Sequence, residues 1–215
     1  MNTLDERLQS IRPRLQKLAS LDPDCVLGGS EAHEYQLALP LSEASVLEFE
    51  KKHEVSLPLD YRRFLLEVGS HGAGPYYGLN PLGDLQHLDK SNRVTDFWKK
   101  PFPLRDWFDL TTNPDSMSDA ERFSDNWVGG TMCLSHQGCG MYDLLVLTGE
   151  ESGYVWTDDR SNELGIYPVA PNREQMGESQ EDATLFTIAE DERLSFLDWY
   201  EWWLDWSFEE AKNLD

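Results

Sequence analysis

The sequence is poor in cysteine and has no long apolar run. Only three cysteines occur in 215 residues, and an odd number gives no framework of paired disulfides. No stretch reaches the ~18–20 apolar residues of a membrane-spanning helix, so we expect no membrane association. The first ten residues, MNTLDERLQS, lack the apolar core of a signal peptide. These features predict a protein of the reducing cytoplasm.

Positive charge is also scarce. The chain has 18 Lys and Arg against 40 Asp and Glu, which gives a formal net charge of -22. An excess of this size repels nucleic acid and anionic membranes, whereas it attracts basic proteins and speeds their association. The same charge also serves general solubility, and both interpretations stay open here. Aromatic residues make up 12% of the chain, so it has the material for a folded core.

The apolar patterns predict helices first, then a sheet, then a closing helix. An amphipathic helix is indicated by Leu4, Leu8, Ile11, Leu15 and Leu18, with Pro13 as its kink or its true start. Further helices are expected after Ser42, a plausible N-cap, and from Pro58 to a C-capping Gly69. After Gly130, short runs rich in β-branched and aromatic residues predict the strands TMCLSH, YDLLVLTG, GYVWTDD and LGIYPVA.

The last helix, RLSFLDWYEWWLDWSFEEAKNL, is rich in tryptophan. At about 100° per residue, its acidic side chains share one strip and its apolar side chains cover the rest. We favour core burial for Trp199, Trp202 and Trp206, with an exposed recognition patch as the alternative. The fold class is therefore α+β in one globular unit. We expect an N-terminal helix and loop over residues 1–40, a mixed, mostly antiparallel sheet and a closing Trp-rich helix within residues 41–215.

Two patterns suggest cofactor or metal sites, and neither satisfies the chemistry. The glycines between Gly69 and Gly78 lack the Lys-Ser/Thr pair and the following helix of a phosphate-binding loop. Cys133, His136 and Cys139 have metal-like spacing but lack a second ligand pair. If TMCLSH is a strand, Cys133 and His136 also point to opposite faces. We therefore predict no cofactor, no metal and no catalytic residues.

Acidic side chains are the candidate partner-binding residues. Asp158 and Asp159 follow the apolar YVW at the end of a predicted strand, where a solvated turn is the main alternative. The remaining candidates lie on the wet strip of the last helix, at Asp198, Glu201, Asp205 and Glu209. Both groups are placed by charge alone, and we expect them to face a basic protein.

Four pieces of the chain occur in a familiar order: LPLDYRRFLLEVGSHGAGPYYGLNPL, KKPFPLRDW, LSHQGCGMYDLLVLTGEESGYVWTDDRSNELGIYPV and SFLDWYEWWLD. With them the chain resembles the SUKH superfamily, and within it the Smi/Knr-like family of cell-wall-assembly regulators, from about Leu41 to Asp205. The resemblance implies an α+β domain whose mixed sheet is packed by helices. It implies function by binding rather than catalysis.

The resemblance assigns a fold role to its shared residues, which are matched here by Leu57, Pro58, Tyr61, Gly78, Gly138, Gly140, Gly149, Gly153 and Trp156. Many members carry an Asp after the glycine matched by Gly140, where this chain has Met141. Most bacterial members resemble immunity proteins that neutralise a cognate toxin, often a nuclease. We therefore expect an immunity protein, with a cytosolic scaffold or regulator of the same fold as the alternative.

Overall fold

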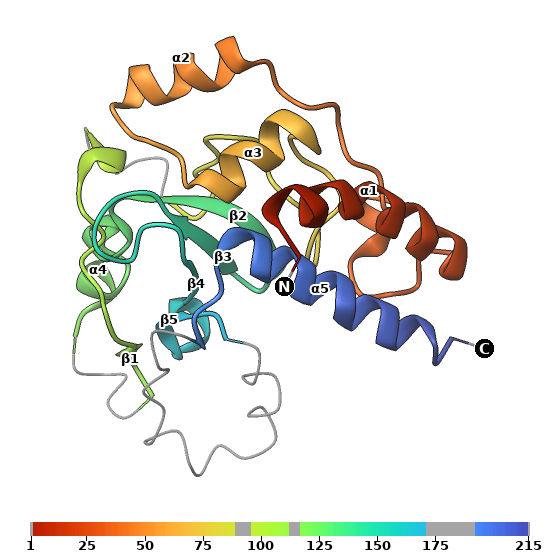
Figure 1. Ribbon diagram of the computed structural model, residues 1–215. Helices are drawn as coiled ribbons and strands as arrows, with labels where there is room; N and C mark the ends of the chain where they lie inside the picture. The colour runs from red at the N-terminus through yellow and green to blue at the C-terminus, as the bar shows by residue number, and fades with distance from the viewer. Residues whose placement is uncertain (1, 89–95, 112–116, 171–191, 215) are drawn as a thin grey trace.

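Helices form the two ends of the chain and a sheet forms its middle (Figure 1). The computed structural model describes residues 2–88, 96–111, 117–170 and 192–214. Its α-helices are α1 (Leu4–Leu21), α2 (Glu43–His53), α3 (Leu59–Glu67), α4 (Asp119–Arg122) and α5 (Phe196–Ala211). Its strands are β1 (Phe108–Asp109), β2 (Thr131–Gly138), β3 (Met141–Val146), β4 (Val155–Asp159) and β5 (Gly165–Pro168). The predicted α+β class is confirmed.

The strands form one sheet in the order β1-β5-β4-β3-β2. Every pairing among the described strands is antiparallel, and the connection between β3 and β4 is the hairpin predicted from TGEESG. The four predicted strands are confirmed as β2 to β5. Short β1 adds an edge strand from a region where the sequence shows no clear period.

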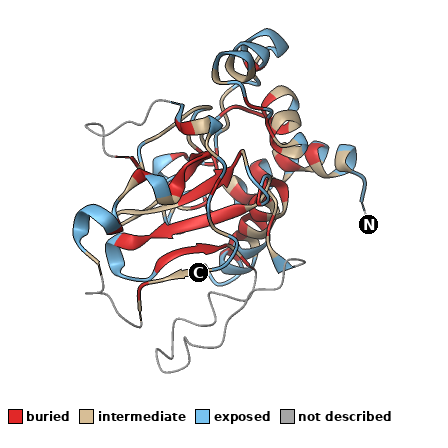
Figure 2. Ribbon diagram, turned by 90° about the vertical axis from the view of Figure 1, so that its left-hand side faces the viewer, coloured by how far each residue is buried: buried red, intermediate tan, exposed pale blue. Residues whose placement is uncertain are grey.

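The sheet is buried on both faces, and its strands are mostly buried in Figure 2. Met132, Leu145 and Val155 point toward the helices and join the core built by α1, α3 and α5. Their neighbours Leu144 and Trp156 point the other way, into a second cluster with residues of the 85–128 segment. Because side chains alternate along a strand, one short apolar run supplies both layers.

Helix α1 begins at a capping box, in which Thr3 and Glu6 bond reciprocally. The helix continues through Pro13, so the interpretation of Pro13 as its start is wrong. Pro13 and Gln9 are both exposed, so water reaches the carbonyl oxygen of Gln9 that Pro13 cannot bond. None of the described helices combines the length and the apolar character needed to cross a bilayer.

Helix α3 buries Tyr61, Phe64 and Leu65, as its pattern predicts. The proposed role of Gly69 as a left-handed cap is wrong, because Gly69 is not among the positive-φ residues and Val68 is the C-cap. A Cβ at Gly69 would lie 2.9 Å from the carbonyl oxygen of Ala38. This glycine therefore permits a close approach of two backbones rather than a turn.

Candidate functional site

Three of the four acidic residues predicted on the last helix face α1. Arg7 donates to Glu201 at 2.8 Å and to Asp198 at 2.6 Å. Partial burial alone would lower the pKa of Arg7, but these two carboxylates outweigh it and raise the pKa. Arg14 pairs with Asp205 at 2.5 Å. The strip therefore joins the last helix to the first, which lies beside it in Figure 1.

Glu209 is the fourth residue of that strip, and its ion pair lies at the end of its own helix rather than with α1. It pairs with Lys212 at 2.6 Å, and both side chains are mostly exposed. An exposed pair of this kind contributes about 0–1 kcal/mol, so Glu209 stays available to a partner. A role in partner binding stays a prediction for all four residues.

Asp158 and Asp159 are buried, so the solvated turn expected at this strand end is wrong. Arg160 grips Asp158 with two hydrogen bonds of 2.7 Å, and it donates a further bond to the carbonyl oxygen of Arg122. Asp159 accepts from Asn162 at 2.6 Å. Both carboxylates are committed to the β4–β5 connection, and neither is presented to a partner in this structure.

A β-bulge overturns the expectation that Cys133 and His136 point to opposite faces. In the register, Cys133 lies opposite Leu144 and His136 lies opposite Tyr142, with a shift between Cys133 and Ser135. The extra residue puts both side chains on the face of Leu144 and Tyr142. The ring of His136 stacks on Tyr142 at 4.9 Å. In the described part of the chain, no three His, Cys, Asp or Glu gather closely enough to hold a metal ion.

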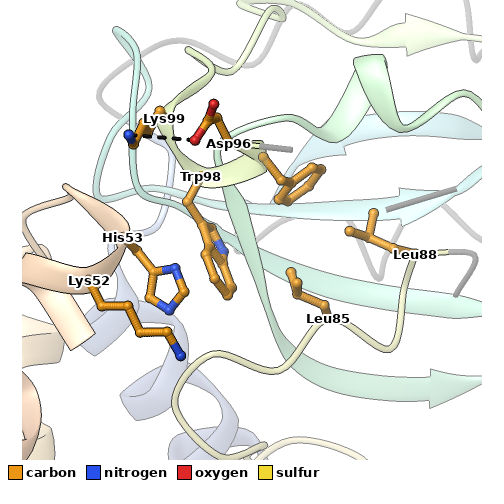
Figure 3. A pocket seen from close by; sticks show the side chains of 8 residues that line it. Lys52, His53, Leu85, Leu88, Asp96, Trp98 and Lys99 are labelled. Carbon is orange, nitrogen blue, oxygen red and sulfur yellow. Dashed lines mark ion pairs between the residues drawn. The ribbon is translucent and has the colours of Figure 1, made fainter. Parts of the chain in front are cut away.

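A small pocket of about 200 Å³ lies between the end of α2 and the segment around Trp98 (Figure 3). His53 packs edge-on against the indole of Trp98, with ring centroids 4.1 Å apart. Lys99 pairs with Glu54 at 2.6 Å and with Asp96 at 3.5 Å. Burial and the charge of Lys52 lower the pKa of His53. The carboxylates offset the pocket's cations, so the pocket offers little charge to a ligand.

A second hollow, of about 300 Å³, lies between four parts of the chain, and we call it the aromatic groove. Its lining residues are Gly28, Gly29, Pro75, Tyr76, Tyr77, Gln137, Trp202, Trp203 and Trp206. Tyr77 is 52% exposed and Trp206 is 37% exposed. The preference for core burial is confirmed for Trp199, but it is wrong for Trp206, and Trp202 is half-buried.

Hydrogen bonds from side chains of β2 and α5 hold the turn between Pro75 and Gly78 and the residues just before it. Ser135 donates to the carbonyl oxygen of Pro75 at 2.7 Å, and Tyr200 donates to that of Ala73 at 2.7 Å. Tyr76 has a left-handed backbone with φ of 53°, which a bulky residue adopts only when its surroundings impose it. The backbone that carries Tyr76 and Tyr77 is therefore held in place by these contacts.

The opposite wall, around Gly28 and Gly29, is held by the buried carboxylate of Asp22. It accepts hydrogen bonds from the backbone of Val26 at 2.8 Å and of Leu27 at 3.1 Å. Burial would raise the pKa of Asp22, but hydrogen bonds from Tyr35 and this backbone hold it below its ordinary value. Sequence periodicity could not find the groove, because its lining comes from two turns, strand β2 and helix α5, which lie far apart along the chain.

Comparison with known proteins gives one match. Neither the curated proteins nor the solved structures contain a match to this chain. Residues 40–179 match the model of the SMI1 / KNR4 family (SUKH-1), a span that includes α2, α3 and all five strands. Members of this family are generally non-catalytic, and the family is compatible with immunity or regulatory roles. The match covers more than half of the sequence, so the chain belongs to the SMI1 / KNR4 family (SUKH-1).

Proposed function

We propose that this chain is a non-catalytic, cytoplasmic immunity protein that binds and neutralises a cognate toxin, often of nuclease type. Membership of the SUKH-1 family carries the proposal, because immunity is one of the roles with which the family is compatible. The rigid groove supports it as well, since preformed concave sites with aromatic walls are typical of binding surfaces.

The charge of the chain points to a basic partner. The formal net charge is -22, which accelerates the encounter with a cationic protein and disfavours nucleic acid. Much of the acidity of α5 is matched by Arg7 and Arg14, so other carboxylates must supply the field at the surface. Asp24, Glu31 and Glu34 are exposed and have no ion-pair partner within the described residues. We place the attraction for the partner there and at Glu209.

Co-expression tests the proposal directly. A nuclease-like domain encoded beside this chain's gene is expressed from an inducible promoter in a bacterial host, with and without this chain. We expect the domain alone to stop growth and this chain to restore it. We also expect the purified pair to co-elute in size-exclusion chromatography and the complex to weaken as salt is raised.

A charge-matched control separates specific neutralisation from general acidity. An unrelated acidic protein of similar size and net charge should leave the toxin active. Growth arrest that persists in the presence of this chain, or rescue by both acidic proteins alike, contradicts the proposal. Growth arrest that persists with this chain, or the absence of any toxin-like gene beside its own gene, favours a cytosolic scaffold or regulator of the same fold.

A further inference from the structure

We propose that the aromatic groove receives an arginine side chain from the surface of a basic protein partner. The inference rests on the proposed function for the existence of such a partner. It adds the site of contact and the residue type that the site recognises. Three independent features of the groove support it: its composition, its surrounding charge and its fixed geometry.

The composition suits a guanidinium group. Tyr77, Trp202 and Trp206 offer partly exposed aromatic faces around a hollow of about 300 Å³. Aromatic faces attract cations, and the planar, weakly hydrated guanidinium of arginine stacks on them better than an ammonium group does. Gln137 lies among them with its side-chain amide. Its Nε2 donates to Asp143 at 2.6 Å, which fixes the orientation of the amide.

The parts of the chain that form the groove contain no lysine or arginine. This holds for the stretches 18–50, 69–88, 124–159 and 194–211, which supply every lining residue. His33, which packs edge-on against Trp203, is neutral near pH 7 because burial lowers its pKa to about 4. A bound cation would therefore meet no lysine or arginine from these stretches, although His136 stacks on Tyr77 with ring centroids 5.8 Å apart.

Carboxylates occur instead in two of the segments that line the groove. Asp24, Glu31 and Glu34 lie on the same loop as Gly28 and Gly29, and they are exposed. Glu209 and Glu210 follow Trp206 by three and four positions in α5, so they share its face of the helix. A cationic segment held in the groove would therefore approach two segments of the chain that carry exposed carboxylates, one of which, Glu209, also pairs with Lys212. A second copy of this chain would bring the same carboxylates, so charge disfavours self-association through this face.

The geometry is fixed before any partner arrives. Gly29 has φ of 82°, and a Cβ there would lie 2.1 Å from the carbonyl oxygen of Tyr76. The two walls therefore meet at a backbone contact that only glycine allows. Trp203, which lines the groove, packs against Tyr200 with ring centroids 5.3 Å apart, and this contact holds its ring in place. A preformed site binds without the cost of ordering its own side chains.

Peptide titration tests the preference for arginine without knowledge of the partner. We would follow the indole N–H signals of Trp202 and Trp206 by NMR while adding a capped Gly-Arg-Gly-Arg-Gly peptide. A second peptide carries citrulline in place of arginine, which keeps the shape and removes the charge. We expect saturable shifts of these two signals with the arginine peptide only. Equal shifts with citrulline, or shifts confined to other residues, overturn the proposal.

Variants connect the effect to the groove. Trp206→Ala and Tyr77→Ala should each weaken arginine-peptide binding roughly 3- to 30-fold, the range of a cation–π contact. Tyr77 is the more exposed of the two, so its variant keeps the test usable if Trp206→Ala fails to fold. Unchanged affinity in a folded variant overturns the assignment.

Charge-neutralising variants test the acidic rim. Glu31→Gln with Glu34→Gln should weaken binding by roughly 2- to 5-fold at low salt. The matched control, Glu48→Gln with Asp106→Asn, removes two exposed carboxylates that lie outside the loop around Gly28 and Gly29, one of them in α2. This control should leave the affinity unchanged. An equal loss in both double variants would show that net charge, rather than the groove, attracts the peptide.

The two proposals fail separately. If this chain rescues growth and Trp206→Ala rescues equally with unchanged affinity for the toxin, the groove is not the contact, although the immunity role stands. If the arginine peptide binds at Trp206 but this chain rescues nothing, the site stands and the proposed function fails.

Discussion

The buried pair of Asp158 and Arg160 gives the sharpest test of how this acidic chain uses its carboxylates. Their side chains are only 6% and 4% exposed, and two hydrogen bonds of 2.7 Å join them. Arg160 also donates to the carbonyl oxygens of Arg122 and Ser124 at 3.0 and 3.1 Å. Replacing Asp158 by Ala would therefore leave a guanidinium fixed in the interior without its counter-charge.

The expected loss of stability is large. Removing one partner of a buried pair costs about 3–5 kcal/mol, because the remaining charge is desolvated and unpaired. For a chain of this size each kcal/mol lowers the melting temperature by roughly 2–4 °C, so Asp158→Ala should melt roughly 6–20 °C lower. Asp158→Leu combined with Arg160→Met removes both charges, so it should cost less than Asp158→Ala alone.

Urea unfolding followed by tryptophan fluorescence measures the free energy of unfolding, and a thermal scan with the same signal measures the melting temperature. Single and double variants are compared at one pH and one salt concentration, and Glu48→Gln serves as the control for loss of an exposed carboxylate. The reasoning is refuted if the free energy of unfolding of Asp158→Ala lies within about 0.5 kcal/mol of that of the unmodified chain, which is the scatter of surface substitutions. It is also refuted if the double variant loses as much free energy of unfolding as Asp158→Leu and Arg160→Met, measured singly, lose when added together.

Two further predictions concern titration and thiol chemistry. Burial lowers the pKa of His87 to about 3, against about 6.5 in the unfolded chain, so only the unfolded chain takes up this proton below pH 6.5. Stability should fall as the pH drops from 6.5 toward 3, by about 2 kcal/mol at pH 5 for this group, and His87→Phe should flatten the slope of urea midpoints against pH. Ellman's reagent should label Cys139 first, because Cys139 is exposed whereas burial raises the pKa of Cys133 and of half-buried Cys25. A fast phase that persists in Cys139→Ser would contradict this order.

Periodicity predicted the elements because it reports local geometry. The four runs after Gly130 became β2 to β5, and Ser42 caps α2 as expected. Their apolar side chains lie on both faces of the sheet. The sequence therefore shows little alternation of polar and apolar residues, and it could not assign each strand residue to a face. Pro13 was harder to interpret, because the surrounding apolar spacing continues across it and solvent satisfies the bond that it breaks.

The candidate site depended on tertiary contacts that no local pattern contains. From the sequence a carboxylate is expected at the surface. Asp158 and Asp159 are buried instead, because Arg160 and Asn162, which follow them closely in the chain, donate hydrogen bonds to them. Conversely, the apolar pattern of the last helix predicts that Trp206 is buried in the core. In the structure its side chain lines the aromatic groove, together with the loop around Gly28. One extra residue between Cys133 and Ser135 reverses the faces of Ser135 and His136, until a second shift between His136 and Gly138.

The ion pairs between α1 and α5 also constrain how the chain acquires its structure during synthesis. Arg7 and its acceptor Glu201 lie 194 positions apart. At about 5–20 residues per second, roughly 10–40 s pass between the appearance of one and the other at the ribosome. During that interval Leu8, Ile11 and Leu15 lack the residues of α5 with which they form the core. Contacts of such long range slow folding, so the nascent chain is an expected client of ribosome-associated chaperones.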